Sequence, residues 1–157
     1  MVDIAKENLC INKLISEKTE IIFVEGDIII PDSKPDVLNT ISTSGIACIY
    51  KKEVQEGKIR FDGSVQTYIM YVPEGKEEGI RGLSTTLDFS ESIEMEGITS
   101  EMQATLTTSV KSVEAKVIND RKIGIKVALE VSAKVYSKDE KGYTRNHRIL
   151  WYCFVRP

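Results

Sequence analysis

The sequence predicts an all-β protein: a single antiparallel β-sandwich or flattened barrel of about seven to eight strands, with an N-terminal arm. Apolar and polar residues alternate over long stretches, which is the period of a strand with one buried face. Short polar turns such as QEG (residues 55–57) separate these stretches. No segment shows a convincing helical period apart from a weak pattern in the arm. The 157 residues suit one domain, which we divide into an arm (1–18) and a β domain (19–157).

The elements follow in order from this pattern. The arm carries scattered apolar residues whose spacing fits either a helix or an extended chain. Residues 20–30 form the first predicted strand, and we expect one short helical turn at residues 36–41. The other predicted strands are residues 45–54, 58–72, 80–97, 104–118, 122–136 and 145–155. Two of them, 104–118 and 122–136, form a hairpin around Asn119 and Asp120.

Two predicted strands have the clearest alternation. In residues 58–72, one face carries Ile59, Phe61, Gly63, Val65, Ile69 and Tyr71. The glycine on this apolar face marks a bulge or a place of close packing. In residues 122–136 every odd position from Ile123 to Val135 is apolar, while the opposite face carries lysine, glutamate and serine. This composition is typical of an antiparallel strand with one face in water.

The first strand ends in a stiff acidic corner, where residues 24–36 read VEGDIIIPDSKPD. Pro31 and Pro35 fix the backbone and remove amide donors, so the strand cannot continue through them. Asp32 and Asp36 can accept hydrogen bonds from nearby backbone amides. We favour this capping role over calcium binding, because the loop has few carboxylates and no EF-hand spacing.

Two predicted strands are apolar on both faces, the first (residues 20–30) and the last. In the last strand, Leu150, Tyr152 and Phe154 lie on one side, with Ile149, Trp151, Cys153 and Val155 on the other. Because large exposed apolar patches are rare on monomers, something must cover the second face. Either the N-terminal arm or another subunit does so.

Composition and motifs argue against several functional classes. The net charge is −3 and no basic stripe stands out, so we expect no nucleic-acid partner. The apolar runs are too short to span a bilayer, and we identify no signal peptide. The lone histidine, His147, lies among basic residues and is poorly placed as a catalytic base. We therefore expect no enzymatic activity, no cofactor and no metal.

The three cysteines form no C-x-x-C pair. We expect Cys48 and Cys153 to be small buried hydrophobic residues. Cys10 lies in the arm, and because an odd number cannot all pair within one chain, it is a candidate for cross-linking to a neighbouring subunit.

Three blocks of sequence, in order, resemble the SPOCS domain of SipL-like spore-coat morphogenetic proteins: VEGDIIIPDSKPDVLNTIS (24–42), KEVQEGKIRFDGSVQTYIMYV (52–72) and INDRKIGIKVALEVSAKV (118–135). The resemblance extends over residues 9–136. It is best in the corner (Pro31, Asp32, Pro35, Asp36) and in the turn that contains Asn119, Arg121 and Lys122. It implies a non-enzymatic role in building or anchoring layers around the endospore of spore-forming anaerobic bacteria.

Two functions are consistent with this resemblance. We favour a self-assembling structural subunit of the spore coat, exosporium or an appendage, made in the mother-cell cytoplasm and ending at the spore surface. Its partner would be the protein itself, and its interface would comprise Leu9, Cys10, Ile11, Leu150, Trp151, Tyr152, Cys153 and Phe154. The alternative is an adaptor that docks another coat protein through Asp32, Lys34 and Asp36.

The two best-matching motifs are also expected to meet in space. Arg121 presents a planar fork of donors that suits a carboxylate. We predict a partly buried bridge to Asp32 or Asp36, whose loss would cost several kcal/mol. The alternative is that Arg121 only caps its own hairpin.

Overall fold

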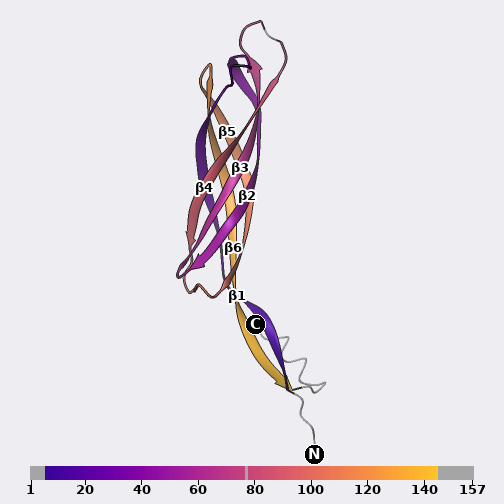
Figure 1. Cartoon of the computed structure of the whole chain (residues 1–157), viewed down its shortest axis with the longest axis vertical. Helices are drawn as coiled ribbons and strands as arrows, with labels where there is room; N and C mark the ends of the chain where they lie inside the picture. Colours follow the sequence, from indigo (N-terminus) through magenta and orange to yellow (C-terminus); the bar gives the residue numbers. More distant parts are fainter. Residues whose placement is uncertain (1–5, 77, 145–157) are drawn as a thin grey trace, which may run out of the picture.

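The computed structural model describes residues 6–76 and 78–144, which form six strands in two three-stranded antiparallel sheets packed face to face (Figure 1). One sheet has the order β1-β6-β5 and the other β2-β3-β4. The strands are β1 (Lys6–Ile29), β2 (Val37–Gln55), β3 (Lys58–Pro73), β4 (Arg81–Glu94), β5 (Gln103–Asn119) and β6 (Lys122–Thr144). The predicted sandwich is confirmed.

Six strands replace the predicted seven to eight for identifiable reasons. The predicted strand at residues 145–155 lies outside the described residues. Residues 6–18 of the arm belong to β1, so the predicted arm boundary falls inside that strand. The helical turn expected at residues 36–41 is wrong, because β2 begins at Val37. Val37 is buried, its amide donates to the Asp120 carbonyl, and it pairs with Pro73, so tertiary bonds favour an extended backbone there.

The core comes from the alternating strands, as the pattern predicts. The central strands bury their odd positions from Ile59 to Tyr71 in β3 and from Ile123 to Val135 in β6, and the hydrophobic side chains there are 0–3% exposed. Gly63 lies at a point of close packing: a Cβ built there would lie 2.5 Å from the Cys48 carbonyl oxygen. The close-packing interpretation of this glycine is therefore confirmed.

The two sheets meet along both pairs of edges. On one side, Thr43 Oγ1 of β2 donates to the Val113 carbonyl of β5 at 2.7 Å. On the other side, a Cβ built on Gly26 of β1 would overlap the side chain of Leu87 in β4. The β1–β4 edge thus packs by close approach of the two strands, and the sandwich resembles a flattened barrel.

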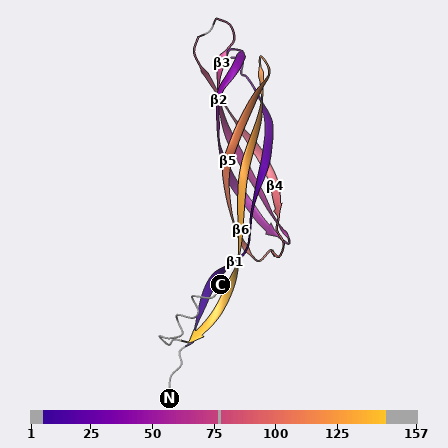
Figure 2. The ribbon, with the colours of Figure 1, turned by 180° about the vertical axis from the view of Figure 1, so that it is seen from behind.

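β1 and β6 are longer than the sandwich. β5 begins at Gln103, opposite Tyr136, whereas β6 continues to Thr144 with β1 as its one described neighbour. The paired segments, residues 6–14 and 136–144, project from the body as a two-stranded ribbon (Figures 1 and 2). The Pro-Asp corner lies at the opposite end, where β1 leaves the sheet (Figure 1).

The described part of the arm, residues 6–18, does not cover the second face of β1. Ile21, Phe23 and Ile29 remain 57%, 58% and 73% exposed. The described part of the arm cannot fold over them, because it continues the same strand into the ribbon. Lys126 Nζ lies 4.8 Å from the Phe23 ring centroid, a cation–π contact that partly shields this aromatic side chain.

Candidate functional site

The Pro-Asp corner contacts Arg121, and the predicted bridge is confirmed. Arg121 Nη1 donates to Asp36 Oδ1 at 2.9 Å, and Nη2 donates to Asp32 Oδ1 at 3.3 Å. The same guanidinium also donates to the backbone carbonyls of Lys34 and Ile30, each at 2.9 Å. The hairpin itself is capped by Asn119 Oδ1, which accepts from the Arg121 amide at 2.9 Å.

The corner is bonded to both sheets. The Ile30 amide donates to the Arg121 carbonyl at 2.8 Å, which joins the end of β1 to the β5–β6 turn. On the other sheet, the Tyr71 hydroxyl donates to the Pro35 carbonyl at 2.9 Å, and Lys34 Nζ donates to the Gly82 carbonyl at 2.8 Å. These bonds close one end of the sandwich, so the corner is part of the scaffold.

The bridge is more exposed than predicted. The side chains of Asp32 and Asp36 are 111% and 48% exposed, and that of Arg121 is 34% exposed. An exposed ion pair contributes little to stability because water screens it. The expected cost of several kcal/mol for losing one charge of a buried pair is therefore too large for these aspartates.

The two strands of the ribbon pair with each other and have no third described strand beside them. Leu9 and Ile11 are half-buried there, while Cys10 is exposed. At its base the register shifts between Leu14 and Ser16, and Leu14 is 47% exposed. Neither of its long edges pairs with another described strand. An edge that pairs with no neighbouring strand can accept a strand from another chain.

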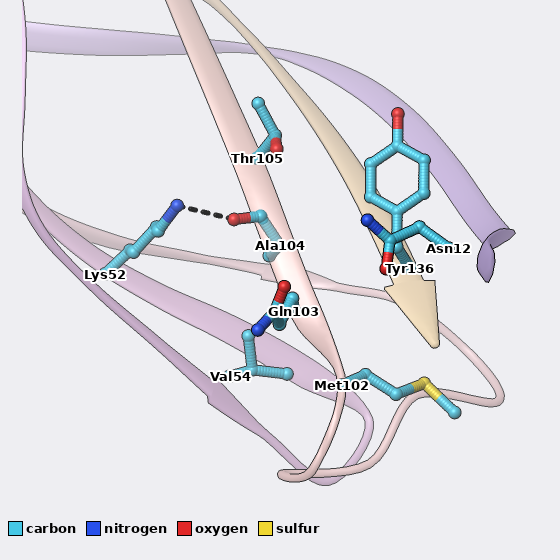
Figure 3. Close-up of a pocket in the computed structure, with 8 residues that line it drawn as sticks. All are labelled: Asn12, Lys52, Val54, Met102, Gln103, Ala104, Thr105 and Tyr136. Carbon is cyan, nitrogen blue, oxygen red and sulfur yellow. Dashed lines mark hydrogen bonds between the residues drawn. The ribbon is translucent and has the colours of Figure 1, made fainter. Parts of the chain in front are cut away.

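A hollow of about 540 Å³ lies at the root of the ribbon, between β2 and β5 (Figure 3). We call it the root hollow; its lining residues are Asn12, Lys52, Val54, Met102, Gln103, Ala104, Thr105 and Tyr136. Lys52 Nζ donates to the Ala104 carbonyl across it at 2.5 Å (Figure 3). A second hollow, of about 290 Å³, shares Met102, Gln103 and Tyr136 and continues along β6 to Lys138. Apolar and polar groups mix in the lining of both hollows.

Sequence reasoning missed the root hollow. Its lining comes from β1, β2, β5 and β6 and from Met102 in the loop before β5. No local motif joins these positions. They come together because β6 extends beyond the start of its neighbour β5, and this offset depends on strand pairing, which the sequence pattern does not show.

The predicted interface residues divide into two groups. Leu9, Cys10 and Ile11 lie together on the ribbon. The second group lies outside the described residues and comprises Leu150, Trp151, Tyr152, Cys153 and Phe154. Cys48, expected to be buried, is exposed, because its position in β2 points to the outer face of the sheet.

Within residues 6–76 and 78–144, no group of three or more His, Cys, Asp or Glu side chains is placed to hold a metal ion. The same residues include no helix that is long and apolar enough to cross a membrane.

Comparison with known families identifies the chain. The family model for the SipL SPOCS domain matches residues 36–118, slightly more than half of the 157 residues. The match begins at Asp36 and ends before Asn119, so most of the corner and the Arg121 turn flank it. No curated protein and no solved structure matched. The chain therefore belongs to the SipL SPOCS-domain family, which indicates a sporulation-related protein.

Proposed function

We propose that this protein is a non-enzymatic, self-assembling structural subunit of a bacterial endospore surface layer or appendage, such as the coat or exosporium. Family membership supports the link to the spore. The observation that carries the assembly role is the ribbon, whose two edges pair with no other described strand.

The ribbon offers a physical route to assembly. A two-stranded ribbon alone is marginally stable in water, and a third strand would complete its hydrogen bonds and cover Leu9 and Ile11. Strand addition draws affinity from the backbone and specificity from the side chains that alternate along the edge. Because donor and acceptor surfaces differ, such a contact is head-to-tail and builds a filament or lattice unless it closes into a ring.

The root hollow extends this surface to the sandwich. β5 begins at Gln103, opposite Tyr136, so a strand added to β6 beyond Tyr136 would continue the line of β5. Its end would lie beside Met102 and Tyr136, where an apolar side chain can enter the root hollow. Exposed Cys10 on the same ribbon is suited to cross-link neighbours once the spore surface becomes oxidising.

The partner in this proposal is the protein itself, together with other coat proteins, and neither nucleic acid nor membrane is required. The protein would be made in the mother-cell cytoplasm and deposited on the forming spore.

Two ribbon variants test the proposal. The first variant deletes residues 1–16 and so removes one strand of the ribbon. The second, Leu9→Lys with Ile11→Lys, keeps both strands and places two positive charges on the ribbon. Both should abolish polymers in negative-stain micrographs and leave species no larger than a dimer in light scattering. Ile21→Lys with Ile29→Lys adds the same charge to exposed apolar positions of the sandwich and should leave polymers intact. Polymers that persist in both ribbon variants would refute the proposal.

A further inference from the structure

The part of β6 that extends beyond β5 has one long edge with no described strand beside it. β5 begins at Gln103, opposite Tyr136, whereas β6 continues to Thr144. The other edge of residues 137–144 is already paired with β1. The open edge therefore comprises residues 137–144, eight positions that continue the line of β5. An edge of this kind can take up one more strand.

The chain leaves this same edge with a strongly apolar segment, which lies outside the described residues. Residues 145–148 read RNHR, and residues 149–156 read ILWYCFVR. Every residue from Ile149 to Val155 is apolar, so the predicted strand has two apolar faces and requires cover on both.

We propose that residues 149–156 fold back along residues 137–144 and form a third strand of the ribbon, with the reversal at residues 145–148. Hairpin loops of two and of four residues are both common, and here both give one pairing, with Ile149 opposite Thr144. The segment and the open edge have the same length of eight residues, so the segment fills the edge up to the start of β5.

This pairing adds large apolar residues to the half-buried rows of the ribbon. Leu9 and Ile11 pair with residues 141 and 139 of β6, and the pairing extends these two rows to Tyr152 and Phe154. A two-stranded ribbon is marginally stable in water, whereas a third strand adds backbone hydrogen bonds and apolar cross-strand pairs. The segment and the ribbon thus supply the cover that each lacks alone.

The hollow of about 290 Å³ beside β6 lies at the end of the proposed strand. Its lining mixes apolar and polar groups and includes Glu101, Ser137 and Lys138. In the proposed pairing Val155 is opposite Lys138, which brings an apolar side chain to this hollow. Arg156 is opposite Ser137, and the carboxylate of Glu101 in the same lining has the charge that a guanidinium prefers.

The physical reason to assign the segment to its own chain is its tether. Residues 145–148 hold it beside the open edge, and a short flexible tether corresponds to an effective concentration in the millimolar range. The segment of a second copy competes only at the much lower bulk concentration of a dilute solution. The next step rests on the proposed function: because the β6 edge is filled, a neighbouring copy adds its strand to the β1 edge of the ribbon, residues 6–14.

Disulfide trapping at micromolar concentration tests the pairing in the full chain with Cys10→Ser, Cys48→Ser and Cys153→Ser. In this background, Lys138→Cys with Val155→Cys places two thiols opposite each other on neighbouring strands, within the range of a disulfide. The matched pair, Ser137→Cys with Val155→Cys, places one thiol on the other face of β6. In oxidised glutathione, the first pair should cross-link within one chain about tenfold faster than the second.

Two results of this trapping would overturn the inference. One is cross-linking of the Ser137 pair at least as fast as that of the Lys138 pair, because the segment would then not have the proposed register. The other is a disulfide-linked dimer in place of a cross-linked monomer, because the segment would then lie on a second copy.

Trp151 gives an independent measurement in the unsubstituted protein, because it is the one tryptophan of the chain and lies within the segment. In dilute native protein, acrylamide should quench its fluorescence less than in urea-unfolded protein. Equal quenching in the two states would also overturn the inference, and this result does not depend on how the cysteine variants fold.

The trapped protein also separates this pairing from the proposed function. A monomer locked through the Lys138 pair has its β6 edge closed, and it should form polymers as the reduced protein does. Polymers in neither form would refute the proposed function and leave the intramolecular cross-link standing. Polymers in the reduced form alone would show that a neighbour needs the β6 edge, which would overturn the assignment of the β1 edge.

Discussion

Replacement of Arg121 by alanine tests which of its contacts stabilise the sandwich. The guanidinium donates to two backbone carbonyls and to two carboxylates. Ile30, whose carbonyl is one acceptor, is 1% exposed as a residue. Removing the donors leaves these carbonyls without their partner at the junction of the two sheets.

The expected loss in the free energy of unfolding depends on how exposed the Arg121 side chain and its partners are. Each lost hydrogen bond to a carbonyl costs about 1 kcal/mol, since water can enter beside a side chain that is one-third exposed. The two carbonyls together give about 2 kcal/mol. The ion pair to Asp36 adds less than about 1 kcal/mol because both groups reach water. For a chain of this length, a loss of 2 kcal/mol lowers the melting temperature by about 4–8 °C.

The assay is urea unfolding followed by circular dichroism, in the Leu9→Lys and Ile11→Lys background, because association would raise the apparent stability. Arg121→Ala should lower the free energy of unfolding by about 2 kcal/mol. Asp32→Ala should change it too little to measure, since that carboxylate is fully exposed. The reasoning is wrong if Asp32→Ala with Asp36→Ala costs as much as Arg121→Ala, because the carboxylates would then dominate.

Three further outcomes are expected. Gly63→Ala should lower the free energy of unfolding by about 1–3 kcal/mol in urea titrations, because its Cβ would collide with the Cys48 carbonyl. Gly82→Ala, which meets nothing within 4 Å, should be neutral, and equal losses in both would contradict the packing argument. Tyr71→Phe should cost about 1 kcal/mol, since the Pro35 carbonyl loses its donor; an unchanged midpoint would mean that water replaces the hydroxyl. Assembled protein should show a dimer band on non-reducing gels that Cys10→Ser removes, and identical migration with and without reductant would exclude the cross-link.

The β class and much of the core could be predicted from the sequence pattern. Strict alternation in β3 and β6 predicted their buried faces, because side chains on a strand point to opposite sides in turn. Turn residues at 55–57 and 119–120 located two hairpins. The contact between Arg121 and the corner could also be predicted, because the guanidinium presents a fork of donors that suits the carboxylates of Asp32 and Asp36.

Which strands are neighbours, and which edges pair with no other described strand, follows from the tertiary structure. Periodicity fixes the face to which a side chain points, but it does not fix the partner strand, because pairing joins segments far apart in the chain. Residues 6–14 meet residues 136–144 in this way, and the ribbon and its root hollow follow from that pairing. The exposure of Cys48 and the start of β2 at Val37 likewise depend on how the strands pair in the folded protein.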